Sequence, residues 1–511
     1  MEATRTDTKK NEMKYEKSEL ELMTTYQLRE ICRREKIMNG VIHPLDKEEL
    51  IQTIMRYMGK RQDFLICDKK KGGEERVEEF LKKTRIVIKP CKDLPCQSQI
   101  LAYEGLSIEY YDGYTIPYKK ELSGTNAFLM GSDMTLCAIL NLKEHGGKQE
   151  KLYLTKAAEL ETRETQRKDY RIFCMGRQNS ECMYHLYYGE QTILPEHIEV
   201  YSIPLIDFVV RKPVTLMLPM AIDFGSVNPT AGVYLDSAYF EHLGQQAAIK
   251  NCRENEINYT VFEDGAGESM LLPSVIGVLA GGGEEGKLLF GYDAIRLANA
   301  SYVDEGFCVF YDVKRWIGEY EKEEEIVDRQ GRRRLVKRAE ILRRFFLYII
   351  RKTENRFKCR ISQVHISSPV KQKHYFRRMF REILPEYMIN QEIMLDEGMA
   401  VLYNTISSML EQDTLEENEE YEALIIDCGG GTTDLCSYRF RIQDRRAAYK
   451  IYMETTYENG DTDFGGNNIT YRIMQILKIA LVRATGNQNV SSVKEILEYM
   501  DTDIYRFIRM E

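Results

Sequence analysis

Residues 423–434 read ALIIDCGGGTTD, a run of apolar residues that ends in an acid and a glycine-rich turn. The apolar run predicts a buried strand ending at Asp427, and a second strand is expected over residues 435–440. Glycines let the backbone approach a ligand without a Cβ clash, and consecutive amides in a turn form a cradle for phosphate oxygens. The residues expected to contact phosphate here are Gly429, Gly430, Gly431 and Thr432.

An earlier stretch repeats this arrangement. Residues 220–226 read MAIDFGS and are followed by a second predicted strand over residues 231–235. Mg²⁺ is usually bound through few carboxylates and keeps most of its waters, so Asp223 and Asp427 would each hold the ion through water. Two such hairpins facing each other would hold a nucleoside triphosphate and its Mg²⁺ from opposite sides.

From about residue 219 to residue 475 the chain resembles the nucleotide-binding domain of the DnaK-type heat-shock chaperones, within the actin superfamily. Actins and sugar kinases share the phosphate loops, but they do not combine them with stretches like VFYDVKRWIG at 309–318 and GDTDFGG at 460–466. The resemblance implies an α/β fold of two lobes, actin-like and ribonuclease-H-like with mixed sheets, that binds ATP or ADP with Mg²⁺. The supporting stretches are LPS at 272–274, ISSP at 366–369, LDEGMA at 395–400, VFYDVKRWIG at 309–318 and GDTDFGG at 460–466.

The resemblance also implies roles for single residues. Asp223 and Asp427 would hold the Mg²⁺ shell, and Glu397 would orient or activate the attacking water. The alternative is that Glu397 is an acid at the start of a helix, where the helix dipole stabilises it, and has no catalytic role. The remaining implied contacts to the nucleotide are Gly225, Ser226, Val227, Gly429, Gly430, Gly431, Thr432, Gly465 and Gly466.

Three departures from the family stand out. The family's lysine, which follows a glycine in the first lobe, aligns with Ile295 after Gly291. Arg296 is the candidate to replace it as a catalytic cation, although arginine differs from lysine in geometry, and a surface arginine is the alternative. Val227 stands where a hydroxyl residue is common. The family's adenosine-contacting helix and closing Gly-Gly-Ser loop have no match before Glu511, so we expect an incomplete second lobe within residues 219–511.

The N-terminal part is expected to hold a disordered lead-in over residues 1–20 and a helical module over residues 21–61. Capping boxes are predicted for the pairs Thr24–Gln27 and Asp46–Glu49, with Gly40 and Pro44 breaking the helix between them. Two short helices at this spacing resemble the SAP-like nucleic-acid-binding module. Eight Lys or Arg against five acids over residues 24–61 give only a weak phosphate-binding surface, so a protein-docking module is the alternative.

Residues 62–218 are predicted to form a β-rich accessory domain. Strands are expected over residues 86–88, 106–111, 152–154 and 198–203, where β-branched and aromatic residues lie between turn residues. No catalytic arrangement is found in this segment, so its role stays open.

Farther along, thirteen Lys or Arg and an apolar stripe over residues 329–360 predict a helix with a solvated basic face that covers a lobe.

Composition limits the partners and the cellular location that are expected for the protein. The 511 residues carry 71 basic and 80 acidic side chains, a net charge of −9, which gives no overall attraction to nucleic acid or anionic membrane. Twelve cysteines without a CxxC pair indicate reduced thiols and a cytoplasmic location. No apolar run reaches the length of a membrane span, so no membrane partner is expected.

The leading functional hypothesis is an ATP-binding and ATP-hydrolysing chaperone-like switch that acts on an unnamed client or partner protein. A non-hydrolysing nucleotide sensor or scaffold is the first alternative, and Ile295 is its main argument. An actin-like filament protein and a small-molecule kinase are the others. The kinase hypothesis lacks an identifiable base for an acceptor hydroxyl.

Overall fold

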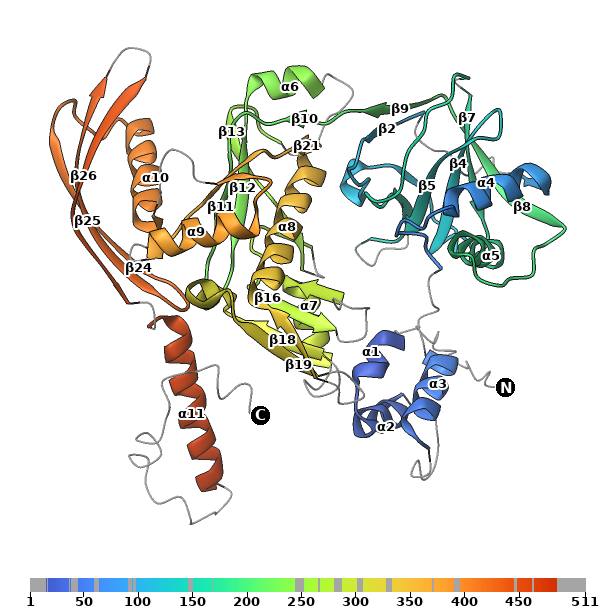
Figure 1. Cartoon of the computed structure of the whole chain (residues 1–511), viewed down its shortest axis with the longest axis horizontal. Helices are drawn as coiled ribbons and strands as arrows, with labels where there is room; N and C mark the ends of the chain where they lie inside the picture. The colour runs from blue at the N-terminus through green and yellow to red at the C-terminus, as the bar shows by residue number, and fades with distance from the viewer. Residues whose placement is uncertain are drawn as a thin grey trace, which may run out of the picture.

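The computed structural model describes residues 15, 17–35, 37, 45–58, 64–90, 94, 98–145, 150–167, 169–243, 252–264, 267–279, 287–300, 307–327, 333–369, 372–389, 396–444, 448–461 and 464–484. Across these residues the fold is mixed α/β, with several separate sheets (Figure 1). No helix in this part of the chain combines the length and the apolar character needed to cross a membrane.

Three short helices form the N-terminal module: α1 (Lys17–Leu22), α2 (Thr25–Arg34) and α3 (Lys47–Met58). The capping box of Thr24 with Gln27 is confirmed, and Asp46 and Glu49 exchange the same pair of hydrogen bonds at 2.9 and 3.0 Å. The predicted lead-in over residues 1–20 is too long, because α1 already begins at Lys17. Leu20 is fully buried in the core of this module, which fixes α1 against its neighbours. Gly40 and Pro44 lie outside the described residues.

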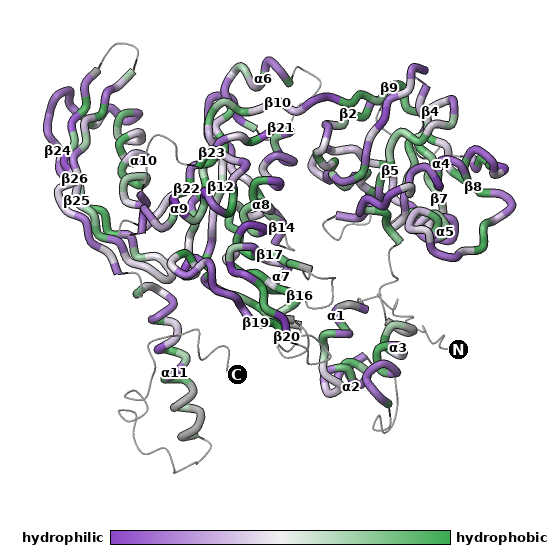
Figure 2. Tube along the Cα trace, viewed as in Figure 1, coloured by the Kyte–Doolittle hydropathy of each residue, from purple (hydrophilic) through white to green (hydrophobic). Residues whose placement is uncertain are grey.

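A seven-stranded sheet dominates residues 64–211. All neighbouring strands are antiparallel except the parallel pair β1 and β8. Hydrophobic residues occur along β5 and β7, the two strands that flank the central strand β4 (Figure 2). In spatial order the strands are β1 (Arg85–Lys89), β8 (His197–Leu205), β7 (Tyr170–Met175), β4 (Thr125–Gly131), β5 (Leu136–Lys143), β6 (Lys151–Thr155) and β3 (Thr115–Pro117).

Both faces of this sheet are covered. Helices α4 (Gly73–Lys83) and α5 (Arg177–Tyr188) pack on one face, and the parallel pair β2 (Gln99–Tyr103) and β9 (Asp207–Arg211) packs on the other. Alternate residues of β4 therefore enter two different cores, Phe128 with the helices and Leu129 with β2 and β9.

Three of the four predicted strands in this segment are confirmed, and they lie in β1, β6 and β8. The strand predicted over residues 106–111 is wrong. A turn at Gly105 (φ 65°) precedes it, and only Ile108 makes a bridge, to Lys156. The short 3-10 helix η1 (Tyr110–Asp112) follows and ends at Gly113 (φ 79°). Left-handed glycines at both ends break the strand that the β-branched residues favour.

A five-stranded mixed sheet begins at the first predicted phosphate loop. Its first three strands are antiparallel, and β11, β22 and β23 are parallel. Helices α8 (Arg338–Phe357) and α9 (Lys373–Ile383) pack on it, so the helix predicted within residues 329–360 is confirmed. In spatial order the strands are β13 (Glu256–Tyr259), β12 (Thr230–Leu235), β11 (Met220–Asp223), β22 (Gln363–Ile366) and β23 (Met388–Ile389).

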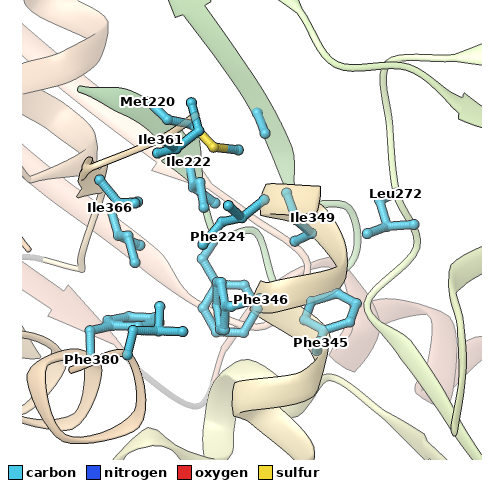
Figure 3. Close-up of a cluster of buried hydrophobic side chains, with 14 of the residues drawn as sticks. Met220, Ile222, Phe224, Leu272, Phe345, Phe346, Ile349, Ile361, Ile366 and Phe380 are labelled. Carbon is cyan, nitrogen blue, oxygen red and sulfur yellow. The ribbon is translucent and has the colours of Figure 1, made fainter. Parts of the chain in front are cut away.

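Aromatic rings join the helices to the sheet. The ring of Phe224, which directly follows β11, lies 4.9 Å from that of Phe346, and Phe346 lies 4.7 Å from Phe380 (Figure 3). Phe224 is fully buried. The residue that precedes the glycine turn is thus anchored in the largest core.

Smaller elements complete the middle of the chain. The three-stranded antiparallel sheet β17–β16–β18 precedes the 3-10 helix η2 (Val313–Glu319). The other elements here are β10 (Val214–Thr215), α6 (Ser237–Leu243), β14 (Phe262–Glu263), β15 (Glu268–Ser269), β16 (Val275–Leu279), β17 (Lys287–Phe290), α7 (Gly291–Ala300), β18 (Phe307–Tyr311), β19 (Glu323–Val327), β20 (Arg333–Lys337) and β21 (Cys359–Arg360).

The second predicted hairpin lies in a three-stranded antiparallel sheet, β24 (Glu420–Cys428), β25 (Thr433–Asp444) and β26 (Tyr449–Asp461). Helix α10 (Glu397–Glu411) packs on one face of it, and α11 (Gly466–Ala484) extends from one end (Figure 1). The order β24–β25–β26 matches β11–β12–β13. The repeated strand, glycine turn and strand predicted from the sequence are confirmed at both places.

Candidate functional site

The first glycine loop follows β11 and is bound by Ser274. Ser274 donates its hydroxyl to the Gly225 carbonyl at 2.8 Å and its amide to the Val227 carbonyl at 2.7 Å. A Cβ at Gly225 would lie 2.7 Å from the carbonyl oxygen of Asn228, so this tight turn requires glycine. Ser274 belongs to the LPS stretch at 272–274, which therefore supports the loop from behind.

The second glycine loop follows β24 and contacts the first loop. A Cβ at Gly431 would lie 2.9 Å from the Ser226 hydroxyl and from Oδ2 of Asp312, and one at Gly430 would overlap Cγ2 of Val227. The loop closes on itself through a 2.9 Å hydrogen bond from the Gly429 amide to the Thr432 carbonyl. The structure thus brings together two loops that are far apart in the sequence, and glycine is what permits their approach.

Gly465 and Gly466 join the second loop at the start of α11. The Gly466 amide donates to the Gly429 carbonyl at 2.9 Å, and the Asn467 amide donates to the Gly430 carbonyl at 2.8 Å. A Cβ at Gly465 would lie 2.6 Å from the Gly430 carbonyl oxygen. All three glycine-containing segments predicted to contact phosphate therefore lie in one place.

Glu397 occupies the first position of α10 and is held there by the N-cap residue Asp396. The Asp396 carboxylate is fully buried and accepts hydrogen bonds from the Met399 amide at 2.6 Å and the Tyr438 hydroxyl at 2.9 Å. Lys373 lies 2.9 Å from its other oxygen. The Glu397 amide donates to the Ser368 carbonyl at 3.1 Å, which ties the start of α10 to the chain beyond β22.

The Glu397 carboxylate pairs with Lys314. Nζ of Lys314 lies 2.7 Å from Oε1 of Glu397, and the two side chains are 5% and 11% exposed. Lys314 comes from the VKRWIG stretch, which folds as η2 after Asp312 in a left-handed conformation (φ 49°). Separating the two groups of so buried an ion pair would leave an uncompensated charge in the interior, which is costly. The two side chains are therefore expected to stay together.

The charges of two further carboxylates act on Glu397. Burial raises the pKa of Glu397 to about 7, Lys314 opposes the rise, and the charges of Asp223 and Asp434 add to it. Asp223 accepts a 2.6 Å hydrogen bond from the Ser367 hydroxyl. A carboxyl group with a pKa near neutrality exchanges protons readily at physiological pH, as general bases and acids do.

Two predicted site residues lie differently from the rest. Arg296 is 61% exposed on α7 and pairs with Asp293, so the structure does not bring it to Glu397. Asp427 lies on β24 directly opposite Asp434, and it is Asp434 whose charge acts on Glu397. Asp434 is only 4% exposed. The structure therefore does not bring Arg296 into the site as the replacement for the family's lysine, but leaves it exposed on α7 beside Asp293.

The sequence argument missed Lys314 and Asp434 as site residues. Both belong to stretches that were singled out, VFYDVKRWIG at 309–318 and the acid that ends ALIIDCGGGTTD. Alignment with the family places its lysine after Gly291, at Ile295, whereas the lysine beside Glu397 lies in η2.

The carboxylates do not form a direct metal-binding cluster. Among the described residues, no three His, Cys, Asp or Glu side chains come close enough to ligate one ion together. Asp223 and Asp434 nevertheless place negative charge around Glu397 beside both glycine loops. A hydrated divalent cation fits this donor set, since hydrated Mg²⁺ is bound through one or two carboxylates and its own waters.

No protein-family model matches the chain, and a search of curated proteins finds no match.

Proposed function

We propose that this protein binds ATP with Mg²⁺ and hydrolyses it, using the two glycine loops as a phosphate site and Glu397 as the base. The observation that carries the proposal is the buried ion pair between Lys314 and Glu397, which lies beside carboxylates at the meeting point of two repeated strand–loop–strand units. The mixed five-stranded sheet is compatible with a ribonuclease-H-like lobe of the actin and heat-shock superfamily.

The residues have separate roles in this proposal. Backbone amides of the two loops, with the hydroxyls of Ser226 and Thr432, would donate to phosphate oxygens. Lys314 would supply the cation that stabilises negative charge on the transferred phosphoryl group, the role that Arg296 cannot fill from its surface position. Glu397 would orient the attacking water and accept its proton.

Carboxylates would hold the cation that accompanies the nucleotide. Asp223, Asp427 and Asp434 are the residues that would bind hydrated Mg²⁺, which supplies charge neutralisation at the phosphates. The positions of Asp223 and Asp434 next to Glu397 support this assignment, because their like charges help raise its pKa.

The contact between the two loops supports a switch. Val227 fills the space beside Gly430, and Ser226 lies against Gly431. Phosphate groups entering between the loops would have to separate them, and each loop continues a different sheet. Binding would therefore change the angle between the two sheets, and this motion is the proposed signal to a partner protein.

The presence of Lys314 favours hydrolysis over the non-hydrolysing sensor. The main argument for the sensor is Ile295 at the aligned lysine position, and Lys314 supplies a lysine from another segment. The filament and kinase alternatives gain no comparable observation. Nucleic-acid binding by residues 21–61 stays a prediction.

Equilibrium binding to the full chain tests the proposal. Mg-ATP should give a saturable heat of binding and raise the melting temperature, because a ligand that binds only the folded state stabilises it by mass action. Chelation of Mg²⁺ and the substitution Asp223→Asn should each reduce the shift. Absence of both binding heat and thermal shift at millimolar Mg-ATP contradicts the proposal.

A further inference from the structure

A second candidate site lies where the seven-stranded sheet meets α8, away from the glycine loops. Several hydrogen bonds fix this junction. Asn355 accepts from the Ser107 amide at 2.9 Å, and Lys358 donates to the Ser107 carbonyl at 2.9 Å and to Asp112 at 2.7 Å. In addition, β10 pairs with β21. The two parts of the chain thus present a defined surface to each other.

A cavity of about 840 Å³ lies at this junction, and we call it the junction cavity. Its walls come from residues 105–109 and β5–β6 on one side and from α8 and residues 386–387 on the other. The volume is within the range of sites for small molecules. Residues that define it are Lys156, Thr155, Asn141, Arg343, Asn355 and Tyr387.

Lys156 is the unusual residue in its wall. Lys156 is only 2% exposed, and within the described residues its ammonium group has no direct hydrogen bond or ion pair, although the charges of Glu74 and Glu159 act on it. Two other lining cations are engaged, Arg343 with Glu386 at 2.9 Å and Arg360 with Glu354 at 3.0 Å. A buried ammonium without a directly hydrogen-bonded counter-ion is unfavourable, so an anion from outside the chain would reduce the free-energy cost of burying the charge.

Thr155 gives a second, independent indication. Its hydroxyl is buried, lines the same cavity and has no hydrogen-bond partner within the described part of the chain. Buried hydroxyls are almost always hydrogen-bonded. A donor and a cation from consecutive residues therefore both lack partners at the same cavity.

We propose that the junction cavity binds a small anion, a molecule whose carboxylate or phosphate group pairs with the Lys156 ammonium and hydrogen-bonds to the Thr155 hydroxyl. Because α8 forms one wall and also packs on the five-stranded sheet, occupancy would stiffen the connection between the two parts of the chain. This site does not depend on nucleotide binding at the glycine loops.

Proton uptake gives the proposal a specific signature. The pKa of Lys156 is lowered to about 8, chiefly by burial and also by the charge of Lys358, whereas the charges of Glu74 and Glu159 act against the shift. Near pH 8 part of the population is therefore uncharged. An anion that pairs with the charged form raises the pKa again, so binding should take up protons from the buffer.

Calorimetry on the full chain tests the inference, with inorganic phosphate and citrate as probes at constant ionic strength. The two arms separate phosphate from carboxylate chemistry. Lys156→Met should weaken binding of the preferred anion by about tenfold or more and abolish proton uptake near pH 8. The substitution removes the charge but keeps an unbranched side chain of similar shape. Thr155→Val should weaken binding severalfold. The matched control Lys143→Met removes an exposed lysine from the same cavity and should change the anion affinity and the proton uptake little.

The readouts distinguish this site from the glycine loops, which would also attract phosphate. Binding there would survive Lys156→Met and would not depend on the Lys156 proton. If wild type binds neither probe, or if wild type, Lys156→Met and Thr155→Val bind both probes equally, the inference is overturned. Thr155→Val keeps the test decisive should Lys156→Met fold poorly.

Discussion

Lys314 Nζ lies 2.7 Å from Glu397 Oε1, across 83 residues of sequence. The pair joins η2, next to the β17–β16–β18 sheet, to the start of α10, next to β24–β25–β26. Because both side chains are almost fully buried, their geometry depends on how these two parts are placed relative to each other. The pair therefore links the chemistry of the site to the arrangement of the loops.

The rate of hydrolysis should depend on the ionisation of Glu397. Burial raises its pKa to about 7, and only the ionised form can accept a proton, so the single-turnover rate constant should rise between about pH 6 and pH 8. Glu397→Gln should lower the rate by about 10²-fold and remove this pH dependence. A wild-type profile that is flat over this range contradicts Glu397 as the base.

The same pKa has a consequence for stability. The folded-state pKa of Glu397 lies above its ordinary value of 4.5, so the folded state binds the proton more tightly. The stability gained from this proton is fully present below pH 4.5 and is lost as pH rises through about 7. Glu397→Gln should therefore flatten the decline in unfolding free energy over this interval, measured by urea unfolding at several pH values.

Nucleotide affinity should depend on glycine at position 431. A Cβ there would lie 2.9 Å from both the Ser226 hydroxyl and Asp312 Oδ2, so Gly431→Ala places a methyl group in the space between the loops that the phosphate groups would enter. We expect the affinity for Mg-ATP to fall by about tenfold or more, because the methyl group competes with phosphate oxygens for that space. The control Gly176→Ala has no atom within 4 Å of the new Cβ and should bind normally. Equal affinities of the two variants contradict the site.

Arg296→Ala should leave hydrolysis unchanged. The guanidinium is 61% exposed and pairs with Asp293, and exposed pairs of this kind contribute about 0–1 kcal/mol to stability. A single-turnover rate within about twofold of wild type is expected, since no lost contact would reach the phosphoryl group. A large loss of rate would return Arg296 to the catalytic residues.

Phe224 should be essential for stability. Its side chain is fully buried against Phe346 and anchors the residue before the first glycine loop. Phe224→Ala should lower the free energy of unfolding of this core by about 3–5 kcal/mol. Trp316, the single tryptophan, belongs to the same core and reports its unfolding by fluorescence. The control Tyr375→Ala removes a 62% exposed ring and should have little effect.

Local features of the structure could be predicted from the sequence. The two strand–glycine–strand units and the Thr24 capping box each depend on residues that are neighbours in the chain. The approach of the two glycine loops is expected from phosphate chemistry and the place of Gly465 and Gly466 from the resemblance, and the three segments do lie together in the fold.

Features that depend on tertiary contacts could not be predicted in the same way. The lysine near Glu397 comes from η2 rather than from α7, and only the packing of two distant segments selects Lys314 over Arg296. The β-rich prediction for residues 62–218 missed α4 and α5. Their apolar faces are buried only once the seven-stranded sheet has formed beneath them.

The most direct test of the account is a double-mutant cycle on the central ion pair, read by single-turnover hydrolysis of saturating Mg-ATP. The variants are Lys314→Met, Glu397→Gln and the double substitution. Residues that act as a unit are strongly non-additive, so each single change should lower the rate constant by about 10²-fold, and the double change should lower it little further. Absence of hydrolysis by the wild-type chain, variant rates equal to that of the wild type, or losses that simply multiply in the double variant would contradict the proposed role of the pair.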